Sequence, residues 1–203
     1  MCVSAATSFD NRVQVTVQGE VVTGTNTMCI LGLKLDRDCS FKSHVQCLKS
    51  KLRSKTWALR KLRKRGLDED KLIYAYKTLI RPSVEYLAPV WSPMITAEQA
   101  ELLERQQVQA LKNIYGPGLS ANKMRVKACV DRLSTRRKTL CLSFATKAVS
   151  NPRSSHWFKP REKPLYARRE GVTCPIYREH AARTDRHKNS PKNNLIRLLN
   201  ENQ

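Results

Sequence analysis

The chain has 203 residues, of which 40% are hydrophobic and 27% are charged, and this composition is close to that of an ordinary globular protein. It excludes wholesale disorder, and no window approaches the length of a membrane span. The 38 Lys and Arg residues against 17 Asp and Glu give a net charge of +21. This excess predicts a polyanionic partner, with nucleic acid as the first candidate. The alternative interpretation is a basic surface that binds no partner.

Short strands are predicted at the N-terminus. Polar and apolar residues alternate from Arg12 to Val17, which places the three valines of this segment on one face of a strand. Gln18 and Gly19 are typical of a turn, and Glu20 to Thr23 of a returning strand. A third strand is predicted from Met28 to Asp36.

Two helices are predicted next. The first begins with Ser40 as its N-cap, carries apolar residues at spacings of three, four and seven, and stops at Gly66. The second begins at the acidic run 68–70, which suits the positive end of a helix dipole, and passes through Leu79. Pro82 is expected to end or bend it.

A third helix has the clearest predicted boundaries. Thr96 and Gln99 have the spacing of a capping box, and Gly116 closes the helix. Two further helices are predicted at Ala121 to Leu133 and Ser134 to Val149, with a break near Ser134.

The predicted fold class is mainly α: a small antiparallel β element at residues 1–38, a helical bundle at 39–150 and a loosely ordered, Pro- and Arg-rich basic tail at 151–203. Within the tail, Leu195 to Leu199 has the spacing of a short helix. The residues expected to share the interior of the bundle are Leu48, Leu52, Leu59, Leu79, Leu103, Ala110 and Ile114.

A run of cations is the strongest candidate site. No acidic residue lies between Asp38 and Asp68, and most of the cations in this interval fall on the first predicted helix. Such a helix can neutralise backbone phosphates without reading sequence. The alternatives are a solvated face or a nuclear localisation signal at Arg60 to Arg65. The residues predicted to contact nucleic acid are Lys49, Lys51, Arg53, Lys55, Arg60, Lys61, Arg63, Lys64 and Arg65.

Trp57 lies among these cations, where an indole could stack on a base, but packing in the core is the interpretation that the sequence favours. The carboxylates are too scattered for a two-metal site, and the four histidines and seven cysteines have no metal-ligand spacing. We therefore expect no catalytic residue, metal or cofactor. Scattered, odd-numbered cysteines indicate reduced thiols in a nuclear or cytoplasmic protein.

Three segments resemble one known family, in the family's order. The run Cys29–Asp36, followed by Phe41 and His44, resembles the "YLG(V/I).LD...F..H" stretch of Jockey-like, LINE-type non-LTR retrotransposon reverse transcriptases. Tyr76–Trp91 resembles the family's "Y..l.rp.leYa..vW" segment, and Leu103–Gly116 resembles its "LE..Q..alr.i.g" helix.

The resemblance implies a primer-grip hairpin that contains Leu31 and Gly32, followed by the helices of a thumb. The family's catalytic Tyr-x-Asp-Asp motif lies upstream of this hairpin, so the resemblance also implies a fragment of an RNA-directed DNA polymerase that lacks the catalytic palm. Such a fragment would bind a template–primer duplex of RNA or DNA without sequence preference, with an upstream palm domain as a second partner in trans. The alternatives are a domesticated structural or RNA-binding adaptor and an artefactual gene model.

Overall fold

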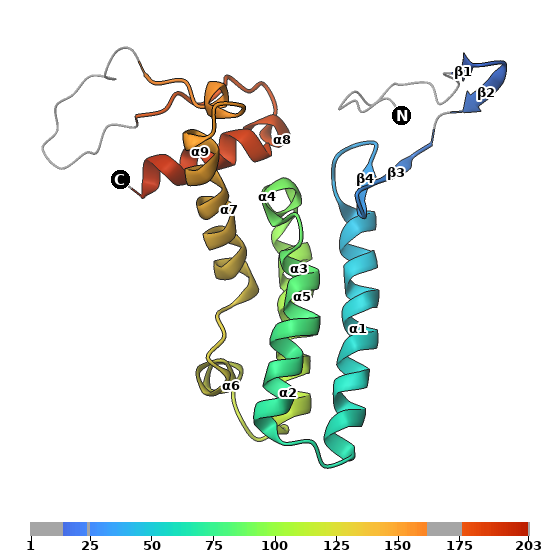
Figure 1. Cartoon of the computed structure of the whole chain (residues 1–203), viewed down its shortest axis with the longest axis vertical. Coiled ribbons are helices and arrows are strands. Elements are labelled where there is room, and N and C mark those ends of the chain that lie inside the picture. The colour runs from blue at the N-terminus through green and yellow to red at the C-terminus, as the bar shows by residue number, and fades with distance from the viewer. Residues whose placement is uncertain (1–13, 24, 162–175, 203) are drawn as a thin grey trace, which may run out of the picture. The chain divides into compact units, whose positions relative to one another are not determined.

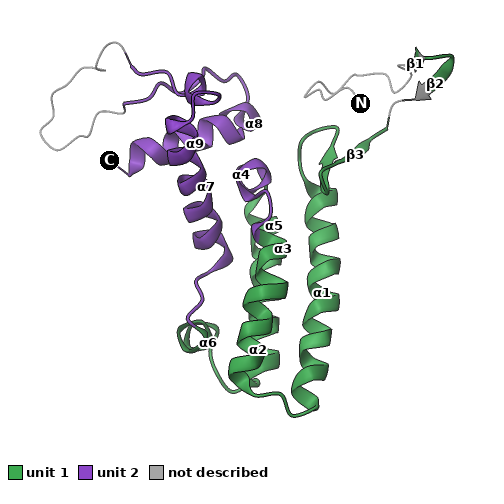
Figure 2. Cartoon of the chain, viewed as in Figure 1, with its two compact units in different colours: residues 1–84, 95–128 green, residues 85–94, 129–203 purple. Residues whose placement is uncertain are grey.

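The computed structural model describes residues 14–23, 25–161 and 176–202. The chain is mainly helical, with short antiparallel strands near its N-terminus, as predicted. It divides into two compact units, coloured separately in Figure 2. Unit 1 comprises Met1–Val84 and Ile95–Ala128, and unit 2 comprises Glu85–Met94 and Cys129–Gln203. Within each unit, helices that lie far apart in the sequence pack together.

The first predicted hairpin of unit 1 is confirmed. Strands β1 (Gln14–Val17) and β2 (Glu20–Thr23) pair antiparallel. Gln18 and Gly19 between them have φ values of 51° and 88°, the doubly positive combination of a turn that matches the twist of hairpin strands. The side chains of the three valines predicted to share one face lie outside the described part of the chain.

The predicted third strand is a second hairpin, so the prediction of one continuous strand is wrong. Strands β3 (Thr27–Ile30) and β4 (Leu33–Asp36) pair antiparallel. Leu31 and Gly32 reverse the chain because both have positive φ values, 50° and 80°. Leu33 is buried where β4 packs against the first helix.

Ser40, the predicted N-cap of helix α1 (Lys42–Lys64), does not cap the helix. The carboxylate of Asp36 accepts a hydrogen bond from its first turn instead. Phe41 occupies the N-cap position in a left-handed conformation and provides no side-chain cap. Asp36 of β4 accepts hydrogen bonds from the Ser43 N–H and from the Ser40 hydroxyl, each at 3.2 Å. Ser40 is therefore a donor to the capping carboxylate, whose negative charge suits the positive end of the helix dipole.

His44 fastens the second hairpin to the first turn of α1. Its buried imidazole accepts a hydrogen bond at Nδ1 from the Lys34 N–H at 3.4 Å, and the Phe41 ring meets it edge-on. Burial lowers the pKa of His44 below its ordinary value, and the charges of Lys51 and Lys34 act in the same direction, while Asp36 opposes them.

We expect unit 1 to lose stability as the pH falls below the ordinary histidine pKa of 6.5, because the unfolded chain then binds a proton that folded His44 resists. The free energy of unfolding should be measured by urea titration between about pH 7 and about pH 5. His44→Gln should flatten this pH dependence, whereas His156→Gln, at an exposed position of unit 2, should not. An unchanged pH dependence in His44→Gln would contradict the prediction.

Gly66 ends α1, as predicted. Its φ of +85° lets the Gly66 N–H bond the Arg63 carbonyl at 3.0 Å, while the Leu67 N–H bonds the Leu62 carbonyl at 3.3 Å. This is the paired arrangement that satisfies the last carbonyls of a helix.

Helix α5 (Ala97–Tyr115) lies lengthwise against α1, and both are labelled in Figure 1. Its predicted capping box is confirmed: the Gln99 N–H donates to the Thr96 hydroxyl at 3.2 Å, and the Thr96 N–H donates to the Gln99 side chain at 2.9 Å. The predicted stop at Gly116 is also confirmed, with φ of 90°. The predicted core residues that are buried are Leu48, Leu52, Leu59, Leu103, Ala110 and Ile114.

Leu79 is the one predicted core residue that the structure exposes, at 60%. Helix α2 (Glu69–Ala75) continues through a π-helical segment, η1 (Tyr76–Ile80), into α3 (Arg81–Glu85), so the helix passes Pro82 without ending. A π-helical turn contains more residues than an α-helical turn, and this shifts the buried face by one position. The buried residues recur every four positions: Leu72, Tyr76, Ile80 and Val84.

A polar network crosses the interior of unit 1 and ties helix α6 (Ala121–Ala128) to α5. Arg125 approaches the Glu104 carboxylate with its Nη2 at 3.5 Å, and its Nε donates to the Gln107 side chain at 3.2 Å. Gln107 in turn donates to the Tyr76 hydroxyl at 3.0 Å. Glu104 is only 4% exposed and Arg125 only 11%. Each charge therefore offsets part of the cost of burying the other.

Unit 2 has its own core, formed by α4 (Ala88–Trp91), α7 (Leu133–Ser150) and α9 (Pro191–Glu201). Wholly buried Trp91 donates from its indole N–H to the Tyr86 carbonyl at 2.9 Å. The break before α7 falls at 129–132, slightly earlier than predicted, where Cys129 has φ of 49°.

A second cluster in this unit consists of Cys141, Ala145, Ala148, Phe158, Leu195, Ile196 and Leu198. Shorter helices are η2 (Ser92–Met94), η3 (Ser155–Trp157) and α8 (Asp185–Lys188).

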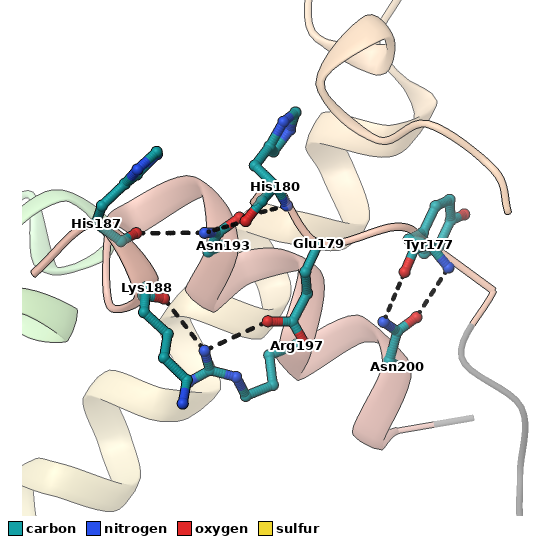
Figure 3. A network of polar contacts seen from close by, with 8 residues as sticks. All are labelled: Tyr177, Glu179, His180, His187, Lys188, Asn193, Arg197 and Asn200. Carbon is teal, nitrogen blue, oxygen red and sulfur yellow. Dashed lines mark hydrogen bonds and ion pairs between the residues drawn. The ribbon is translucent and has the colours of Figure 1, made fainter. Parts of the chain in front are cut away.

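Helix α9 includes the short helix predicted in the tail. Two of its asparagines form hydrogen bonds with the backbone of residues 177 and 180, which precede the helix (Figure 3). Asn193 accepts from the His180 N–H at 2.9 Å and donates to the His180 carbonyl at 3.1 Å. Asn200 makes the same pair of bonds with Tyr177, both at 3.0 Å. The described residues of the tail thus include a helix that is packed against α7.

Candidate nucleic-acid interface

The outward face of α1 carries a row of cations around an indole. Positions 53, 60, 61 and 64 each lie three, four or seven positions from position 57, and such spacings place side chains on the same face of a helix as residue 57. All five side chains are exposed, on the side opposite the buried leucines of α1. We call this set the Trp57 stripe: Arg53, Trp57, Arg60, Lys61 and Lys64.

Trp57 is 54% exposed, so the prediction that it packs in the core is wrong. The physical reason is its angular position on α1, because Thr56 occupies the neighbouring buried position between Leu52 and Leu59. The Lys61 ammonium lies over the Trp57 ring, 3.8 Å from its centroid. This cation–π contact holds one positive charge at the indole.

Not all of the predicted cations belong to the stripe. Lys55 donates to the Leu79 carbonyl at 2.7 Å and to the Ser83 hydroxyl at 2.5 Å, so its ammonium is bound within unit 1. Arg63 donates to the Asn113 carbonyl at 3.1 Å. The remaining three predicted cations, half-buried Lys49 and exposed Lys51 and Arg65, lie on α1 or at its C-cap, outside the stripe.

The charge of the stripe is not neutralised by carboxylates within the described part of the chain. No ion pair joins a stripe cation to a carboxylate there, whereas some cations elsewhere in unit 1 have acidic partners. Lys71 pairs with Asp68 at 3.0 Å, and Lys127 pairs with Glu69 at 2.5 Å. The stripe is therefore a local source of positive potential that favours an anionic partner.

Leu31 and Gly32, which the resemblance places in a primer grip, form the turn of the β3–β4 hairpin, and Leu31 is 78% exposed. The hairpin is attached near His44. Arg53, the first residue of the stripe, lies nine positions further along α1, which is roughly 13 Å of helix rise. The point where the hairpin is attached to α1 and the first residue of the stripe are therefore separate positions along the helix.

Two neighbouring carboxylates, those of Asp36 and Asp38, accept hydrogen bonds at the start of α1. Asp36 caps α1, and Asp38 accepts a hydrogen bond from the Ser40 N–H at 3.1 Å. Among the described residues, no group of three or more His, Cys, Asp or Glu side chains is placed to hold a metal ion. In the same residues, no helix combines the length and the apolar character that crossing a membrane requires.

Comparison of the chain with protein-family models, with curated proteins and with solved structures found no match. The resemblance to reverse transcriptases therefore rests on the three ordered motifs alone.

Proposed function

We propose that unit 1 binds RNA or DNA through the Trp57 stripe, by contacts to phosphates that do not depend on sequence. The observation that carries this proposal is the row of exposed cations on α1 without acidic partners in the described part of the chain. Each guanidinium or ammonium group of the row can neutralise one backbone phosphate and release its counterion. The arginines add bidentate geometry, which suits phosphate oxygens.

A narrower proposal is that unit 1 is the thumb region of a non-LTR retrotransposon reverse transcriptase and grips a template–primer duplex beside a palm domain supplied in trans. The three ordered motifs support it. On this proposal the chain extends no primer by itself, because Asp36 and Asp38 serve the start of α1. A domesticated RNA-binding adaptor is the second candidate, favoured by the separate buried core that each unit possesses.

Lysine footprinting tests the broader proposal in the full chain. Surface lysines are acetylated with and without an excess of nucleic acid, and mass spectrometry measures the reaction at each site. We expect bound nucleic acid to protect Lys61 and Lys64, because their ammonium groups would be covered by phosphate. Lys112 and Lys123, exposed on α5 and α6 of the same unit, should stay reactive. Protection that is equal at all four lysines would contradict the proposal.

A further inference from the structure

We propose that Trp57 stacks on an unpaired base, so that the preferred ligand of the stripe is single-stranded RNA or DNA. This inference rests on the broader of the two proposed functions, phosphate binding by the Trp57 stripe, and specifies single strands as its substrate class in place of the template–primer duplex of the narrower one. Aromatic stacking tolerates any sequence, because every base has a π face, and it requires bases that are not enclosed in a duplex.

The exposure of Trp57 sets it apart from the other tryptophans. Trp91 is wholly buried in unit 2, and Trp157 is partly buried against the second cluster of that unit. Trp57 contributes to no such core and leaves half of a large apolar ring in water. Burial of that area against a base would be favourable, since apolar surface is removed from water on both partners.

The cations around the ring are spaced to follow a strand. Arg53 and Lys64 lie eleven positions apart, which corresponds to roughly 16 Å of helix rise, a length that spans several phosphates of one strand. Trp57 lies between them, and Lys61 holds its ammonium 3.8 Å from the centroid of the ring. A base stacked on the indole would therefore carry its own phosphate close to a cation.

The geometry also distinguishes single strands from duplexes. The side of a duplex presents phosphates, which the cations can bind, but its base faces are covered by neighbouring base pairs. Trp57 can add to the affinity only where a base face is open. An acidic peptide or an anionic lipid surface offers charge without any base, so neither uses the ring in this way.

The test measures the dissociation constants of the full chain for three ligands of equal length by fluorescence anisotropy: a single-stranded oligonucleotide, its duplex, and an abasic strand. Trp57→Ala should weaken binding of the single strand by about 5- to 150-fold, the usual contribution of one stacked base. Affinity for the abasic strand should not change. Trp57→Phe should retain most of the single-strand affinity, and Tyr74→Ala, which removes an exposed aromatic ring on α2, should have no effect.

Three results would overturn the stacking proposal: no loss of single-strand affinity in Trp57→Ala, an equal loss on the abasic strand, or equally tight binding of polyglutamate by the wild-type chain. Failure of the proposed function looks different, because the wild-type chain would then bind none of the three nucleic-acid ligands. If wild-type binding depends on salt but Trp57→Ala does not change it, the proposal of phosphate contact stands and only the stacking proposal fails.

Discussion

Arg125→Met should lower the free energy of unfolding by about 3–5 kcal/mol, the usual cost of removing one partner from a buried ion pair. Glu104 would remain in the interior of unit 1 at 4% exposure without the guanidinium that lies 3.5 Å away. Gln107 would also lose the donor to its side-chain oxygen. A buried charge or acceptor that loses one partner keeps the cost of having been removed from water and loses part of what offset that cost.

Urea unfolding followed by circular dichroism measures this effect, and a second variant separates charge from packing. Glu104→Leu combined with Arg125→Met should recover most of the lost stability, since no uncompensated charge remains. Arg105→Met on α5 is the matched control, because Arg105 forms a largely exposed pair with Glu101 that should contribute little. A loss below about 1 kcal/mol in Arg125→Met, or no recovery in the double variant, would show that the network does not stabilise unit 1.

The features that could be predicted from the sequence are those set by local backbone chemistry. Gly66 and Gly116 end their helices because both have positive φ, and the capping box at Thr96 depends only on Gln99 three residues later. The turn at 18–19 is equally local. In each of these cases the deciding contacts lie within a few residues of one another.

The features that could not be predicted depend on helix phase or on distant partners. Leu79 has α-helical spacing in the sequence, but the π-helical segment at 76–80 turns it outward. Ser40 has the residue type of an N-cap, yet its hydroxyl donates to Asp36 of a preceding strand. The packing of α9 against α7 likewise joins two segments that lie far apart in the sequence, and the spacing of residues within either segment does not indicate the other as its partner.

The candidate site shows the same limit. The run of cations was evident in the sequence, but only the fold separates those bound by neighbouring carbonyls, such as Lys55 and Arg63, from those that remain on the outer face. The sequence favours a core position for Trp57, but the residue is 54% exposed. Its spacing from Arg53 and Lys61 was the signal that could have placed it on the charged face.

The most direct test of the central claim is the salt dependence of duplex binding after four stripe cations are replaced. In the variant Arg53→Gln, Arg60→Gln, Lys61→Gln, Lys64→Gln, the slope of log K against log salt concentration should flatten by about 3 to 4 units, since each lost phosphate contact contributes about 0.9. The control variant replaces four exposed cations elsewhere in unit 1, Lys71, Arg105, Lys112 and Lys123, with glutamine. Both variants lower the net charge by four, so a difference between their slopes reports which cations are removed and not how many. We predict a flattened slope in the first variant and a slope close to that of the wild type in the second. Equal slopes in the two variants would contradict the claim that α1 holds the phosphate contacts.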